Sequence, residues 1–150
     1  QQSRANTSLV YHGGQLMALW EAGLPYTLKM MCDGVVETVG QMVFDGKLKT
    51  PFTAHPKLDP ATGKLYGFGY QPDSKPYLTF FVLDAEGNLE RQFPLPLERP
   101  VMIHDFSITE THAVFMDLPL FFDPSGMLSG KLPIIYKKEA GSRIGVIPLD

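Results

Sequence analysis

The chain has 150 residues, of which 44% are hydrophobic and 19% charged, and its formal net charge is −3. This composition is typical of a globular domain with a buried core. The slightly acidic balance excludes the strongly basic surface of a nucleic-acid-binding protein. No apolar run reaches the roughly 20 residues that cross a bilayer, and the single cysteine, Cys32, cannot form an internal disulfide. We therefore expect a cytoplasmic protein, soluble or peripheral to a membrane, with no nucleic-acid partner.

Neither end of the chain resembles the natural end of a protein. Gln1-Gln-Ser-Arg4 contains neither an initiator methionine nor a signal peptide, and Ile147-Pro-Leu-Asp150 contains no evident terminal element. No linker or low-complexity segment interrupts the residues between them. We expect residues 1–150 to be part of a single domain that is truncated at both ends.

Short apolar runs separated by turn residues indicate an all-β fold. The chain contains 13 prolines and 14 glycines, and they leave no stretch of helical periodicity long enough for an ordinary helix. In chain order, the predicted strands are 9–12, 15–20, 64–70, 77–83, 89–93, 101–108, 113–122, 134–136 and 143–147. A single helical turn is predicted at 125–130.

The segments between these strands have the chemistry of tight turns. Gly13-Gly14 is a favoured two-residue hairpin turn, and 59–63 and 84–87 each begin with Asp and end with Gly. A further hairpin is predicted across 109–111. Repeated turns of this kind indicate a meander of antiparallel strands, which is also the local pattern of β-propeller blades.

Two histidines occur in apolar, strand-like segments and are candidate metal ligands. His55 lies within Phe52-Thr-Ala-His-Pro-Lys57, and His104 lies within Met102-Ile-His-Asp-Phe106. Pro56 favours an extended backbone at His55, and strand alternation would place His104 on one face with Met102 and Phe106. Neutral imidazole is the commonest biological ligand for first-row transition metals. Each histidine could equally be a half-buried side chain bonded to a main-chain carbonyl.

The sequence around these histidines resembles the carotenoid cleavage oxygenase family over nearly the whole chain. The segments that carry the resemblance are Pro51-Phe-Thr-Ala-His-Pro-Lys-Leu-Asp-Pro60, Arg99-Pro-Val-Met-Ile-His-Asp-Phe-Ser-Ile-Thr109 and Asp117-Leu-Pro-Leu-Phe-Phe-Asp-Pro124. The resemblance implies a seven-bladed β-propeller, of which this chain would form about two to three blades. It also implies a non-haem Fe(II) dioxygenase that cleaves a conjugated C=C bond of a carotenoid or apocarotenoid with O2, giving two carbonyl products.

The resemblance assigns roles to three residues. His55 and His104 match the first two of the family's four histidine ligands to Fe(II). Glu21 matches an outer carboxylate that accepts a hydrogen bond from a ligand histidine, and His104 is the expected partner. With two of the four ligands outside these residues, the isolated chain is expected to be inactive and to bind metal weakly.

Trp20 bears on the choice of substrate. In the stilbene-cleaving branch of the family a lysine usually precedes this glutamate, whereas tryptophan offers an apolar wall suited to a polyene tunnel. A small polyene and O2 are therefore the expected partners, and the sequence leaves open whether the polyene is taken from a membrane. Packing in the core is the other interpretation of Trp20.

Three alternatives accompany this interpretation. They are a stilbenoid-cleaving oxygenase, a non-catalytic β-propeller that only binds a partner, and a calcium-dependent lactonase-like propeller. His12 and His112 match no ligand position of the family, and both are expected to be surface histidines near loop ends.

Overall fold

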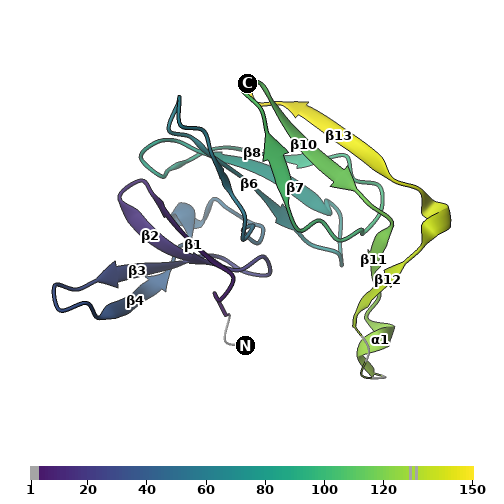
Figure 1. The fold of residues 1–150 in the computed structure, drawn as a ribbon, viewed down its shortest axis with the longest axis horizontal. Coiled ribbons are helices and arrows are strands. Elements are labelled where there is room, and N and C mark those ends of the chain that lie inside the picture. The colour runs from purple at the N-terminus through teal and green to yellow at the C-terminus, as the bar shows by residue number, and fades with distance from the viewer. Residues whose placement is uncertain (1–3, 129, 131) are drawn as a thin grey trace.

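The computed structural model describes residues 4–128, 130 and 132–150, which form mostly antiparallel strands (Figure 1). Helical structure in this part of the chain is confined to short elements, namely η1 (Phe44–Gly46), α1 (Ser125–Leu128) and η2 (Lys138–Ala140). No helix within the described ranges is long and apolar enough to span a membrane. The all-β prediction is confirmed. The helical turn predicted at 125–130 corresponds to α1, while Ser129 lies outside the described residues.

The first sheet has four strands in the order β1-β2-β3-β4. Its strands are β1 (Ser8–His12), β2 (Gln15–Leu19), β3 (Tyr26–Met30) and β4 (Val36–Gln41). The β1–β2 hairpin turns at Gly13-Gly14 as predicted, with positive φ at both glycines. Strands β3 and β4 were not predicted. Almost every residue of β4 is exposed, so no buried face imposes an apolar alternation on its sequence.

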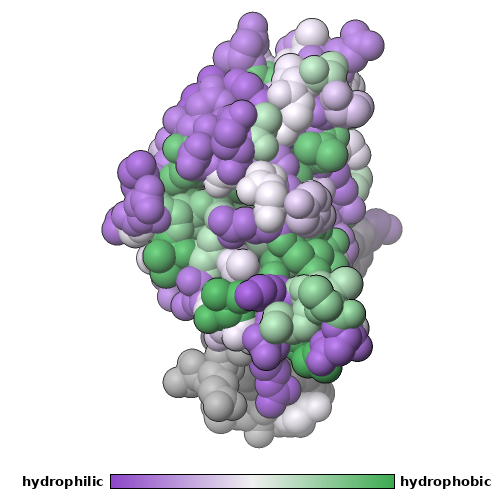
Figure 2. All heavy atoms as spheres, turned by 90° about the vertical axis from the view of Figure 1, so that its left-hand side faces the viewer, coloured by the Kyte–Doolittle hydropathy of each residue, from purple (hydrophilic) through white to green (hydrophobic). Residues whose placement is uncertain are grey.

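Part of the apolar surface of the chain lies on this sheet. Figure 2 looks onto the side from which β3 and β4 project and shows apolar residues exposed among polar ones. The large exposed apolar side chains of β1, β3 and β4 are Leu9, Tyr11, Met30, Val36 and Val39.

The second sheet is the most buried part of the molecule. It runs in the order β5-β6-β7-β8, and its strands are β5 (Lys57–Leu58), β6 (Leu65–Tyr70), β7 (Leu78–Leu83) and β8 (Leu89–Leu95). Every residue of β7 is buried, which explains why its sequence is a continuous apolar run rather than an alternating one. Strand β5 has only two residues, too few to be recognised from the sequence.

The two faces of β7 belong to two separate cores. Phe81 and Leu83 pack with Met17 and Leu19 of the first sheet, whereas Phe80 and Val82 join the cluster that includes residues of the third sheet. The second sheet is therefore packed between two neighbours. Four-stranded antiparallel sheets stacked in this way have the arrangement of consecutive β-propeller blades.

The third sheet is made of β13-β10-β9, beside a two-stranded ribbon of β11 and β12. The strands are β9 (Phe106–Ile108), β10 (His112–Asp117), β11 (Leu120–Phe122), β12 (Ile134–Tyr136) and β13 (Arg143–Pro148). The predicted hairpin across 109–111 is confirmed as β9–β10. The predicted strand 113–122 is divided, because Leu118-Pro119 separates β10 from β11. The predicted strand 101–108 shrinks to β9 plus an isolated bridge at Val101.

The first two sheets meet at their hairpin turns. His12 is only 6% exposed, and its Nε2 lies 2.7 Å from the main-chain oxygen of Asp84. The expectation that His12 is a surface residue is therefore wrong, because the turn of a neighbouring sheet covers it. His112 is partly buried beside the β9–β10 turn, where its Nδ1 lies 2.8 Å from Thr111 Oγ1.

Candidate metal centre

His55 lies in the short irregular segment that leads into β5. The three residues before it are buried, with Phe52, Thr53 and Ala54 at most 1% exposed. Thr53 donates its main-chain N–H to Phe68 of β6 at 2.8 Å, and its Oγ1 accepts the main-chain N–H of His55 at 3.0 Å. Ser8 Oγ also contacts the carbonyl of Ala54. A firmly anchored backbone therefore carries the half-buried imidazole.

His104 occupies the corresponding place before β9. It lies between the buried residues Ile103 and Phe106, which are 4% and 3% exposed. His104 and Asp105 are both exposed, so the strand alternation expected for Met102, His104 and Phe106 is broken. The expectation that both histidines lie within strands is wrong. Each lies in a bend or extended segment just before its strand, where side-chain direction is not set by the pleat.

The structure brings the two imidazoles together. Nε2 of His55 lies 3.0 Å from Nε2 of His104, and the ring centroids are 4.6 Å apart at an interplanar angle of 67°. A metal–imidazole bond is about 2.1 Å long, so two such bonds at a right angle place their nitrogens about 3.0 Å apart. The donor set and its spacing fit two neighbouring ligands of one metal ion.

Glu21 adds a carboxylate behind His104. It lies in the turn after β2, and its Oε1 is 3.2 Å from His104 Nδ1, the contact expected from the family resemblance. An ionised carboxylate only accepts hydrogen bonds, so this contact favours the neutral tautomer with the proton on Nδ1, in which Nε2 keeps its lone pair. Trp20 precedes Glu21 and is partly buried.

An ion pair links the two histidine segments and was not anticipated from the sequence. Lys57 Nζ lies 2.7 Å from Asp105 Oδ1, and the same oxygen accepts the main-chain N–H of Phe106 at 2.8 Å. Partial burial acts to raise the pKa of Asp105, but the bonds from Lys57 and Phe106 outweigh it and hold that pKa below its usual value. The sequence did contain a signal for this ion pair: a basic residue, Lys57, closely follows His55, and an acidic residue, Asp105, follows His104.

No group of three or more His, Cys, Asp and Glu side chains in the described ranges is arranged to hold a metal ion. The described residues thus bring together two imidazoles and one carboxylate. Neither His12 nor His112 lies with them, since each has its own partner near a hairpin turn.

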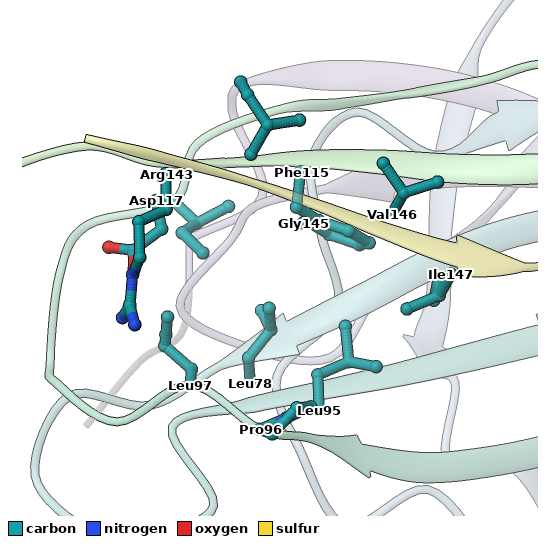
Figure 3. Close-up of a pocket in the computed structure, with 12 residues that line it drawn as sticks. Leu78, Leu95, Pro96, Leu97, Phe115, Asp117, Arg143, Gly145, Val146 and Ile147 are labelled. Atoms are coloured by element: carbon teal, nitrogen blue, oxygen red, sulfur yellow. The ribbon is translucent and has the colours of Figure 1, made fainter.

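An apolar pocket lies away from these histidines. A cavity of about 260 Å³ opens between the ends of β7 and β8 and strand β13, and neither His55 nor His104 lines it (Figure 3). Asp117 and Arg143 are at one end of it, where Arg143 Nη2 is 2.6 Å from Asp117 Oδ2. Because its charged groups already pair with each other, we assign no chemistry to this cavity.

The fold and the site define a β-propeller protein in which imidazoles from adjacent blades converge. The family model described as retinal pigment epithelial membrane protein matches residues 1–150. The chain belongs to this family. It is 46% identical over 145 residues to the carotenoid 9,10(9',10')-cleavage dioxygenase 1 of Arabidopsis thaliana, covering 96% of this chain and 27% of the relative. The corresponding enzyme of Phaseolus vulgaris is 45% identical over 144 residues, covering 95% of this chain and 26% of the relative.

Solved structures agree with this assignment. The lignostilbene dioxygenase of Pseudomonas brassicacearum superposes with a TM-score of 0.83 at 36% identity, covering 98% of this chain and 31% of that one. A cobalt-substituted apocarotenoid oxygenase from Synechocystis gives 0.79 at 29% identity, covering 97% and 32%. The prediction of a β-propeller fragment is confirmed. The chain spans about a quarter of the length of the curated relatives it matches.

Proposed function

We propose that the full-length protein containing this chain is a non-haem Fe(II) dioxygenase that cleaves a conjugated C=C bond of a carotenoid or apocarotenoid. One O2 molecule supplies one oxygen atom to each alkene carbon, so two carbonyl products form and no other oxidant is consumed. The observation that carries this proposal is the 3.0 Å approach of the two histidine Nε2 atoms. The relatives named for carotenoid cleavage, at up to 46% identity, support the substrate class.

In this proposal the metal is held by His55 and His104 through Nε2. Fe(II), when bound, supplies the redox chemistry that activates O2. Glu21 accepts the Nδ1–H of His104, which fixes the ring orientation and makes Nε2 a better donor. We propose that two further histidine ligands come from other parts of the full-length protein, and that residues 1–150 form part of one seven-bladed propeller domain.

Trp20 is the proposed apolar wall of the substrate tunnel. It is partly buried and directly precedes Glu21, so a polyene that passes the metal would run beside it. Two structures of the Synechocystis enzyme carry replacements of a tryptophan and of the glutamate that follows it, the same dipeptide as Trp20-Glu21. This similarity supports a site at these residues.

The proposal is tested on the full-length protein, purified without oxygen and loaded with Fe(II). We expect about one iron per chain and cleavage of a carotenoid into two carbonyl fragments, each carrying one 18O atom when the reaction is run under 18O2. The product masses should first be compared with those expected for cleavage at the 9,10 (9',10') bond. This is the bond that appears in the relatives' names. His55→Ala and His104→Ala should each abolish cleavage. An active protein without iron, or with both histidines replaced, would contradict the proposal.

Stilbenoid cleavage is the second candidate, because a lignostilbene dioxygenase has the TM-score of 0.83 noted above. A hydroxylated stilbene assayed beside the carotenoid separates the two substrates. Turnover of the stilbene alone would move the assignment to that class.

The location that we infer is cytoplasmic, either soluble or peripheral to a membrane. The support is compositional: the balance of hydrophobic and charged residues is that of a globular protein, and a single cysteine is compatible with a reducing compartment. Fractionation of cells that express the full-length protein, with and without a high-salt wash, distinguishes a peripheral protein from a soluble one.

A further inference from the structure

The two ligand-bearing segments belong to different sheets. His55 leads into β5 of the second sheet and His104 into β9 of the third. Within the described residues, no main-chain hydrogen bond joins segment 51–58 to segment 99–108. The separation of the two imidazoles therefore depends on side-chain packing and on polar contacts between side chains.

Apart from the imidazoles themselves, Lys57 bridges these segments in the described part of the chain: it forms an ion pair with Asp105 and lies over the Phe106 ring, 5.8 Å from its centroid. The Nζ–Oδ1 distance is 2.7 Å, and the side chains are 28% and 47% exposed. Lys57 is in β5, two residues after His55, while Asp105 directly follows His104. A bond between these positions constrains both histidine backbones at once.

Both partners are also held within their own segments. Lys57 pairs with Tyr66 in the β5–β6 register, and Asp105 Oδ1 accepts the N–H of Phe106. Phe106 is buried and stacks on Phe115 with ring centroids 5.1 Å apart. The ion pair thus joins two segments that are each anchored in a packed sheet, so little further freedom is lost when it forms.

We propose that Lys57 and Asp105 are a positioning pair that holds His55 and His104 at the spacing needed for one metal ion. This inference rests on the proposed function, because it presumes that both histidines bind the same metal. Neither residue is a ligand in this scheme.

The test compares Co(II) binding by variants of the full-length protein, using chelator competition for affinity and the visible spectrum for geometry. Lys57→Met and Asp105→Asn should each weaken Co(II) binding about tenfold, a loss typical of residues that support metal ligands. The double variant should lose no more than either single one, because the pair acts as a unit. Lys57→Arg keeps the charge and should retain the wild-type spectrum.

Lys64→Met is the matched control. Lys64 pairs with Glu90 at 2.8 Å, with side chains 35% and 43% exposed. Lys64 directly precedes β6 and Glu90 is in β8, so this ion pair does not join the two histidine segments. We expect its Co(II) affinity and spectrum to match the wild type. The inference is overturned if Lys57→Met binds Co(II) like the wild type, or if Lys64→Met weakens binding equally. A wild-type protein that binds neither Co(II) nor Fe(II) in a defined ratio would overturn the proposed function itself.

Discussion

Glu21 Oε1 lies 3.2 Å from His104 Nδ1, although 83 residues separate the two in the chain. The contact connects the turn after β2 in the first sheet with the segment before β9 in the third. It orients the His104 ring so that Nε2 faces His55. Three sheets therefore contribute to one small site, with a carboxylate from the first and imidazoles from the other two.

The first prediction concerns this carboxylate. Glu21→Gln keeps an oxygen that can accept the Nδ1–H but removes the charge that makes the imidazole more basic. We expect Fe(II) or Co(II) affinity of the full-length protein to fall about 10- to 100-fold, measured by chelator competition. Glu37→Gln, on the exposed strand β4, is the control and should leave the affinity unchanged. If Glu21→Gln and the wild type bound the metal with equal affinity, the charge of Glu21 would play no part in metal binding.

The second prediction isolates the contact between the first two sheets. Gly13 and Gly14 both have positive φ, but a Cβ on Gly13 would lie 2.4 Å from the Glu86 carbonyl oxygen, whereas one on Gly14 would meet nothing within 4 Å. Alanine has an unfavourable φ at both positions, so this strain cancels when the two variants are compared. The remaining difference in unfolding free energy measures the contact between position 13 and Glu86. In urea unfolding, Gly13→Ala should be less stable than Gly14→Ala by about 1–3 kcal/mol. Similar unfolding free energies for the two variants would mean that the Gly13-Gly14 turn and the 84–87 turn are not in contact in solution.

The third prediction tests the close approach of β6 to the segment that leads to His55. A Cβ on Gly69 would lie 2.2 Å from Thr50 Oγ1 and 2.4 Å from the Pro51 carbonyl oxygen. We expect Gly69→Ala to cost about 1–3 kcal/mol of unfolding free energy and to weaken metal binding, because the displaced backbone continues to His55. Gly40→Ala in β4 has open space around it and serves as the control. Wild-type stability of Gly69→Ala would contradict this packing.

The fourth prediction concerns the low-pH limit of stability. The Asn88 side chain and its main-chain N–H both donate to the Asp84 carboxylate and hold its pKa below the usual value. A carboxyl with a lowered folded-state pKa contributes stability above its unfolded pKa of about 3.9, and that contribution is lost as the pH falls through the folded value. Below about pH 4, the unfolding free energy of Asp84→Asn should therefore fall less steeply with decreasing pH than that of the wild type.

Asn88→Ala provides the companion measurement. It keeps the Asp84 carboxyl but removes the side-chain donor, so part of the same pH dependence should disappear. The unfolding free energy is measured from about pH 6 downward through the unfolded pKa of about 3.9. A slope for Asp84→Asn identical to that of the wild type would mean that the Asp84 carboxyl makes no pH-dependent contribution to stability.

The sequence alone was sufficient where the signal is local. Gly13-Gly14 and the turn 84–87 required glycine at positions of positive φ, and the structure has those turns. Strands β6 and β7 were recognised because each carries a dense apolar run. Strands β3 and β4 were missed, since an exposed hairpin needs no apolar face and therefore leaves no periodic pattern.

The candidate site could be predicted only in part from the sequence. His55 and His104 stood out as histidines in apolar surroundings, and their assignment as ligands came from the family resemblance. Strand alternation placed His104 in a strand, and Pro56 suggested a strand-like segment at His55. Both expectations are wrong, because irregular segments before β5 and β9 carry the two histidines. The burial of His12 was also missed, since its cover comes from Asp84 in another sheet.

The sequence by itself therefore determined the all-β class and the main hairpins, and it indicated the candidate metal ligands. The tertiary structure alone decided which of these residues meet: His55 with His104, His104 with Glu21, and Lys57 with Asp105. The physical reason is that turns and strands depend on neighbours a few residues away, whereas the contacts of the site form between separate sheets. Their distances are set by how the buried faces of those sheets pack, and no local pattern records that.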